Sequence, residues 1–135
     1  MAKIVLTDAK VTINSVILSD HISNVTIDTK DDVIDTTGFG STAKTRVAGL
    51  VDNSVTFDFF QDFAAANAEA TIYPLLGTTT TIVIVPTSST ITTTNPSYTF
   101  TALVSEWQPL KAAVGQLATA SVTWPISGAI TKANA

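Results

Sequence analysis

Few side chains in this sequence could do chemistry, and the single histidine is the first to consider. His21 directly follows Ser19 and Asp20, and serine, aspartate and histidine are the residue types of a hydrolase triad. Triad members converge from separated positions, whereas adjacent residues of an extended segment point to opposite faces. The spacing therefore predicts a histidine in a turn. We assign no catalytic residue and expect the protein not to be an enzyme.

Four aspartates form the main candidate for a metal site. Asp28, Asp31, Asp32 and Asp35 lie close together in the sequence, and carboxylates are ligands that calcium prefers. The segment lacks the alternating amide ligands, the central glycine and the terminal glutamate of a calcium-binding loop. We therefore expect a solvated acidic segment that holds no metal.

The glycine-containing segment Gly38-Phe39-Gly40 is the remaining candidate for a binding motif. Phosphate-binding loops have a different glycine spacing, with a lysine at a fixed position after it. No cofactor is therefore expected. A phenylalanine between two flexible glycines instead predicts an exposed aromatic anchor that docks on a partner.

The composition indicates one domain, residues 1–135, that associates with other chains. A chain of 135 residues can bury a core without disulfides, and this one contains no cysteine. Its hydrophobic fraction is 45%, its charged fraction is only 13% and its mean hydropathy is +0.35. No apolar run approaches the roughly 18 residues of a membrane span, so no membrane is expected as a partner. Apolar surface left over by the core would then serve assembly.

The charge pattern argues against attraction to nucleic acid. The net charge is −4 and the seven basic residues are scattered, whereas phosphate binding needs clustered lysines and arginines. Asp8 interrupts the N-terminal segment before the apolar core of a signal peptide could form. We therefore expect synthesis and assembly in the cytoplasm.

Alternation of apolar and polar residues predicts β-structure on both sides of one helix. The clearest strands contain Val55, Phe57 and Phe59, and later Val122 and Trp124, and these five side chains are expected in the core. Weaker strands are expected near residues 4–6, 11–13, 16–18, 25–27, 78–85 and 98–102, and residues 131–135 are expected to form a polar tail.

The expected helix covers residues 62–76. Its alanines favour helix, Asp62 is a suitable N-cap, Pro74 could kink or shorten the last turn, and Gly77 would end it. The fold class predicted is mainly β, with one flanking helix, as an antiparallel β-sandwich or a small barrel with a long loop between strands.

That long loop is residues 28–49, where apolar alternation fades into a polar, glycine-containing connection. Such a connection in a compact domain is usually functional or disordered. We expect it to be flexible in the free subunit and ordered in an assembly, because it cannot bury enough apolar surface alone.

The order of these segments resembles the major tail tube proteins of long-tailed, siphovirus-like bacteriophages. The resemblance covers most of the chain and rests on residues 16–21, 35–40, 45–50, 57–76 and 122–128.

The resemblance implies a structural virion protein whose hexameric rings stack into the tail tube, assembled in the host cytoplasm. It implies contacts with other copies and with other tail proteins, and DNA that passes through without specific binding. Residues 28–49 occupy the place of the long loop or hairpin between early strands that, in this family, reaches the neighbouring ring. The assembly-interface residues expected there are Thr37, Gly38, Phe39, Gly40 and Arg46.

Two other classes of protein remain open. A capsid decoration or head-to-tail completion protein would also be small, β-rich and free of cysteine, but would bind a preformed shell. A carbohydrate-binding adhesin module would use Trp107, Tyr98 or Phe39 as an exposed stacking platform. For a tube, the surplus of eleven acidic over seven basic residues predicts an acidic inner wall that has no affinity for DNA.

Overall fold

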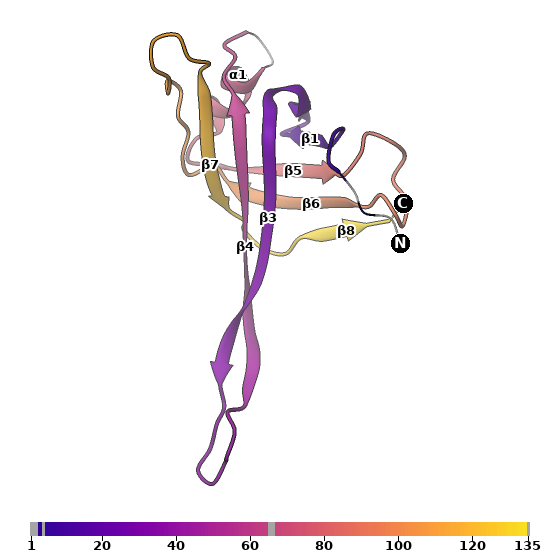
Figure 1. The fold of residues 1–135 in the computed structure, drawn as a ribbon, viewed down its shortest axis with the longest axis vertical. Coiled ribbons are helices and arrows are strands. Elements are labelled where there is room, and N and C mark those ends of the chain that lie inside the picture. The colour runs from indigo at the N-terminus through magenta and orange to yellow at the C-terminus, as the bar shows by residue number, and fades with distance from the viewer. Residues whose placement is uncertain (1–2, 4, 65–66, 135) are drawn as a thin grey trace.

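The structure is a computed structural model that describes residue 3 and residues 5–64 and 67–134. It consists of two antiparallel β-sheets packed against each other, with a long two-stranded arm projecting from one of them (Figure 1). The strands are β1 (Lys10–Ile13), β2 (Val16–Ile17), β3 (Ile22–Asp35), β4 (Arg46–Phe60), β5 (Thr79–Val85), β6 (Ser97–Leu103), β7 (Thr119–Pro125) and β8 (Thr131–Ala133). The helical segments are η1 (Ser19–His21), α1 (Ala68–Ile72) and η2 (Tyr73–Leu75).

The strand order distinguishes the two sheets. One sheet has five strands in the order β2-β1-β5-β6-β8, and the other has three in the order β3-β4-β7. The strands of the two sheets cross each other in the view of Figure 1. A bridge between Ala102 and Ile126 joins β6 to the chain just after β7. The fold is therefore a sandwich, and the alternative of a small closed barrel is wrong.

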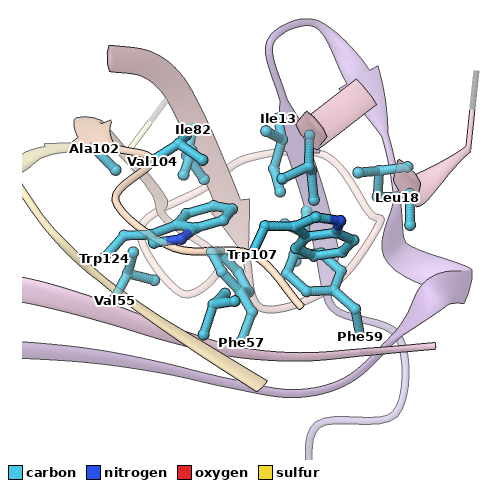
Figure 2. Close-up of a cluster of buried hydrophobic side chains, with 14 of the residues drawn as sticks. Ile13, Leu18, Val55, Phe57, Phe59, Ile82, Ala102, Val104, Trp107 and Trp124 are labelled. Carbon is cyan, nitrogen blue, oxygen red and sulfur yellow. The ribbon is translucent and has the colours of Figure 1, made fainter. Parts of the chain in front are cut away.

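The core lies between the sheets, and its aromatic centre comes mainly from β4 and β7. Phe57, Phe59 and Trp124 are fully buried, and Trp107 joins them from the segment after β6 (Figure 2). The Phe59 ring meets Trp107 edge-on at 5.2 Å between centroids, and Phe57 meets Trp124 in the same way at 5.7 Å. The predicted core positions, Val55 and Val122 among them, are confirmed as buried.

The helix is shorter than expected. The helix α1 begins at Ala68, and residues 65 and 66 of the predicted helix lie outside the described residues. The Asp62 carboxylate does not cap α1; it accepts hydrogen bonds from the Ala64 backbone and the Asn67 side chain in the preceding turn. Pro74 lies in the 3₁₀ segment η2, and α1 ends before it at Ile72, so the predicted shortening of the helix is confirmed. Gly77 follows η2 with φ +84°. Among the described residues, Asp62, Ala64 and Asn67 lie outside α1, so the predicted start of the helix at residue 62 is wrong.

The prediction of a long loop over residues 28–49 is wrong for most of that segment. Residues 28–35 belong to β3 and residues 46–49 to β4, and only residues 36–45 connect the two strands. Polar residues form strands here because each strand finds its hydrogen-bonding partner in the other. Together with residues 50–53 of β4, the segment forms an antiparallel β-hairpin, residues 28–53, which we call the arm.

Two smaller expectations also differ from the structure. Val5 and Leu6 lie in irregular chain, where a strand was expected, and Ile4 lies outside the described residues. The expected C-terminal tail instead contains β8, whose Thr131 pairs with Thr99 of β6. This short strand forms because its backbone pairs with the open edge strand β6. It contains too few apolar residues to be predicted from alternation.

Candidate assembly surface on the projecting arm

The arm begins where the third strand of its sheet ends. Along β4 the pairing with β7 starts at Ser54, so residues 46–53 pair only with β3. Asn53 is the last buried residue of β4 before the arm. Every residue of β3 from Asp28 to Asp35 is exposed. Among the residues that the structure describes, the arm beyond the sandwich therefore has neither a third strand nor a facing sheet.

A β-bulge shapes the middle of the arm. Asp31 pairs with Val51 and Val33 with Ala48, so β4 contributes one extra residue between these two pairs. Gly49 lies in this interval, where an added Cβ would be 3.0 Å from Ile34 Cδ1. The absence of a side chain at Gly49 therefore leaves room for the Ile34 side chain to lie across the neighbouring strand. A β-bulge also increases the local twist of the two strands. Figure 1 shows the two strands crossing along the arm.

The neck of the tip loop is held by a set of threonine hydrogen bonds. The Thr45 backbone N–H donates to Thr37 Oγ1 at 2.9 Å, and the Thr36 N–H donates to the Thr45 carbonyl at 2.9 Å. The Thr37 N–H donates to Asp35 Oδ1 at 2.8 Å, and hydrogen bonding from Thr37 lowers the pKa of Asp35. The tip is therefore a shaped loop, and the hydrogen bonds from Thr37 favour the ionised form of the Asp35 carboxylate at its base.

The tip presents one aromatic side chain to solvent. Phe39 has a relative exposure of 111%, and the following Gly40 has φ +87°. A positive φ favours glycine, so Gly40 lets the chain reverse immediately after Phe39. Thr37, Gly38, Phe39, Gly40 and Arg46, the five residues predicted for the interface, all lie at this end of the arm, with Arg46 paired to Asp35. Their role in an interface remains a prediction.

Sequence reasoning missed other apolar residues of the arm. Cross-strand partners share a face of a hairpin, so the pairs Val33 with Ala48 and Ile34 with Val47 place apolar side chains on both faces. The signal was present in short apolar runs within 33–34 and 47–51, which the polar composition around them obscured. Six large apolar side chains of the arm are exposed: Val33, Ile34, Phe39, Val47, Leu50 and Val51.

The histidine lies at the other end of β3, in η1, and binds two carboxylates. His21 Nδ1 is 2.8 Å from Asp20 Oδ1, and Nε2 is 2.9 Å from Asp62 Oδ2. The hydrogen bond to Asp62 raises the pKa of His21, while partial burial opposes the shift. Hydrogen bonds from the Ala64 backbone and from His21 lower the pKa of Asp62. Ser19 Oγ accepts a hydrogen bond from the Val11 backbone N–H at 2.9 Å.

The sequence also offered candidates for a metal site and for an exposed aromatic stacking platform. Within the part of the chain that the structure describes, no three histidine, cysteine, aspartate or glutamate residues are grouped so as to hold a metal ion. Trp107 and Trp124 are buried, so they do not form an exposed stacking platform. No described helix has the length and apolar character to cross a lipid bilayer.

Comparison with known proteins relates the fold to phage-type tails. No protein-family model matches the chain, and no curated protein matches it by sequence. Among solved structures, the SPP1 tail tube matches with a TM-score of 0.76 at 12% identity, over 98% of this chain and 80% of that chain. A chain from the tail of an empty GTA particle, refined with C6 symmetry, matches with a TM-score of 0.59 at 12% identity, over 82% and 81%.

A third similar structure comes from a baseplate. A chain of the anti-feeding prophage (AFP) baseplate, 6-fold symmetrised, matches with a TM-score of 0.58 at 11% identity, over 99% of this chain and 98% of that chain. Sequence identities of 11 to 12% support a similarity of fold and nothing beyond it. The chain has the fold of the tail tube class, and the resemblance inferred from its sequence is confirmed at that level.

Proposed function

We propose that this chain is a structural subunit of a phage-type tail tube, which associates with its own copies into stacked rings around a channel for DNA. The observation that carries the proposal is the arm, with six large apolar side chains exposed on a two-stranded ribbon. A ribbon that cannot bury these side chains itself gains stability when a second protein surface covers them. The similarity to tail and baseplate chains supports another copy, or another tail protein, as that surface.

The proposed ring is a hexamer. Two of the similar structures are described with C6 or 6-fold symmetry, and a closed ring needs the same pair of complementary surfaces on every subunit. The subunit would be made and assembled in the host cytoplasm and reside in the tail of the virion. This is a structural role and requires no cofactor.

The outer face of the β3-β4-β7 sheet is the proposed channel wall. Strand alternation sends Thr56, Asp58, Ser121 and Thr123 to the side opposite the buried aromatic residues. The Thr56 and Thr123 hydroxyls are 3.1 Å apart across the strands. The parts of this sheet in the sandwich, residues 22–27, 54–60 and 119–125, contain Asp58 as their one charged residue. A wall of hydroxyls and a carboxylate offers DNA phosphates no cation to bind, so DNA can slide past it.

Binding of DNA at low salt tests this wall. Assembled tubes are expected to show no salt-sensitive affinity for double-stranded DNA, even at low ionic strength, where electrostatic attraction is strongest. The matched control is Thr56→Lys with Thr123→Lys, which places cations on the same face and should create such an affinity. Salt-sensitive binding tighter than about micromolar by the unaltered tubes, beyond the strength of ordinary non-specific binding, would contradict the proposed wall.

Negative-stain electron microscopy of the purified protein tests the function itself. Rings or tubes are the expected result. Monomers or small closed oligomers that bind a preformed capsid would support a decoration or head-to-tail completion protein instead. Retention on a glycan column that free sugar reverses would support the adhesin module.

A further inference from the structure

The strand β7 is a terminal strand of the three-stranded sheet, and among the described strands none pairs with its outer edge. Such an edge presents backbone groups on which a strand of another chain can add. At the two ends of β7, the Ala118 carbonyl and the Ile126 N–H bind the backbone of Gln61 and Asn53 on the β4 side. Alternate residues of a strand direct their backbone groups to the same side. The outer edge is therefore the side of residues 119, 121, 123 and 125.

Side chains from the segment before β7 occupy the two central donors of this edge. The Thr123 N–H donates to Glu106 Oε1 at 2.8 Å, and the Ser121 N–H donates to Gln108 Oε1 at 3.1 Å. The two acceptors are two residues apart, as are the two donors, and alternate residues of an extended segment share one side. The carboxylate and the amide therefore take the place of the carbonyl groups that a neighbouring strand would supply.

The two outer positions of the edge are closed in other ways. The Thr119 N–H donates to the Lys111 carbonyl at 3.3 Å. Pro125 has no N–H to offer, and proline is a common feature of protected edge strands. The outer edge of β7 therefore has no unoccupied backbone donor at any of its four positions.

The backbone of this segment is fixed, whereas its two acceptor side chains are free to move. Residues 106–111, which we call the edge guard, belong to the chain that runs beside β7 in Figure 1. Trp107 of the guard is buried in the core, where Figure 2 shows it near Phe59. The Trp124 Nε1–H donates to the Glu106 carbonyl at 2.9 Å. Glu106 is exposed and Gln108 is half-buried, so both side chains can swing away while the core stays packed.

We propose that the edge guard is an autoinhibitory contact, which keeps β7 of the free subunit from pairing with an edge strand of a second copy. Strand addition at β7 would first have to break the hydrogen bonds of Glu106 and Gln108, and Pro125 would still leave one position unpaired. The guard therefore prevents single subunits from joining through this edge. The inference concerns the free subunit and does not depend on a role in a tail.

Amide hydrogen exchange of the free subunit tests whether the guard occupies the two donors. The test variant is Glu106→Ala with Gln108→Ala. The matched control is Glu106→Gln with Gln108→Glu, which keeps the net charge and leaves an Oε acceptor at each position. By NMR, the Ser121 and Thr123 amides are expected to exchange about tenfold faster in the test variant, the change that loss of one net hydrogen bond produces. The control is expected to exchange as the wild type does, and equal rates in wild type and test variant would overturn the proposal.

Association of the free subunit tests the inhibition itself. A second variant, Pro125→Thr, adds a donor to the edge and leaves both guard side chains in place. Sedimentation velocity is expected to show both variants associating at about tenfold lower concentration than the wild type and the matched control. Circular dichroism confirms that each variant is folded.

Wild-type association behaviour of both folded variants would overturn the proposal, even if exchange at the edge were faster. Both measurements are made on the free subunit, below the concentration at which the wild type assembles. Their failure is therefore distinguishable from an absence of rings or tubes, which would contradict the proposed function instead.

Discussion

The strands β3 and β4 each pass through two different environments, the sandwich and the arm. In the sandwich, residues 54–60 of β4 lie between two partner strands and beneath a facing sheet, and alternate residues are fully buried. In the arm, residues 46–52 pair with β3 alone, and six of these seven residues are exposed. Backbone hydrogen bonds are made in both regions. The difference shows that burial depends on what covers a ribbon, whereas pairing needs only a second strand.

Apolar residues have different energetic roles in the sandwich and in the arm. Trp124 contributes to the free energy of folding because the chain itself encloses it. Phe39 contributes nothing of that kind, because solvent surrounds it in the single chain. If the arm is an assembly element, substitutions in the sandwich should change stability and substitutions in the arm should change association.

The largest effect is expected from Trp124→Ala, which leaves a cavity between the sheets. Loss of a buried tryptophan typically costs about 3 to 5 kcal/mol of unfolding free energy, a large share of the roughly 5 to 15 kcal/mol available to a domain. Urea or thermal unfolding measures it. Phe39→Ala is the matched aromatic control and should change the stability of the free subunit by less than about 0.5 kcal/mol. Equal melting temperatures for Trp124→Ala and wild type would remove the distinction between the two regions.

The next effect is expected from Phe39→Ala on assembly. Truncating an aromatic anchor commonly costs about 2 kcal/mol or more of binding free energy, which corresponds to about a thirtyfold rise in the critical concentration. Sedimentation of tubes over a concentration series measures it. Thr42→Ala, another substitution in the same exposed loop, is the control and should assemble normally. A wild-type critical concentration for Phe39→Ala would exclude the anchor role.

Hydrogen exchange should separate the two regions more finely. In the free subunit, the amides of residues 28–35 and 46–49 are expected to exchange faster than those of residues 55–59, because a ribbon open to solvent on both faces opens locally at little cost. Assembly should slow exchange in the arm, while the core amides change little. Mass spectrometry of free and assembled protein measures both rates. Equal protection of arm and core in the free subunit would show that the arm does not need a partner to be ordered.

The smallest expected effect concerns His21, at the end of the sandwich away from the arm. Its pKa is raised in the folded state above the ordinary 6.5, so its contribution to stability is present at lower pH and is lost as pH rises through the folded pKa. The pKa of Asp62 is lowered below the ordinary 3.8, so its contribution is lost only as pH falls through that lower value. The stability difference between wild type and His21→Gln should therefore be greatest between about pH 4 and 6 and shrink toward pH 8. Urea unfolding at several pH values measures it, and a difference independent of pH would contradict the charged pairing.

The sequence was sufficient to identify the strands that carry a regular alternation of apolar residues. Val55, Phe57 and Phe59, and then Val122 and Trp124, were predicted in the core and are buried there. Alternation predicts these strands well because one face of each strand packs against the core and the other does not. Apolar and polar residues therefore alternate along the chain. Phe39 could also be identified as a candidate contact, because two glycines flank an aromatic residue with no apolar pattern around it.

Sequence reasoning failed where structure depends on partners distant in the chain. The arm lacks regular alternation because neither face is buried by the chain itself, and so the sequence predicts a loop there instead of two strands. The strand β8 exists because the edge of β6 is open to it.

The sequence by itself determined the all-β class, the aromatic core and the exposed phenylalanine, since these follow from local residue types and their period. Only the tertiary structure decided that residues 28–49 form a projecting hairpin and that the loop before β7 lies at the opposite end of the molecule. The physical reason is that backbone pairing and the placement of loops depend on contacts between segments far apart in the chain. No local pattern encodes such contacts.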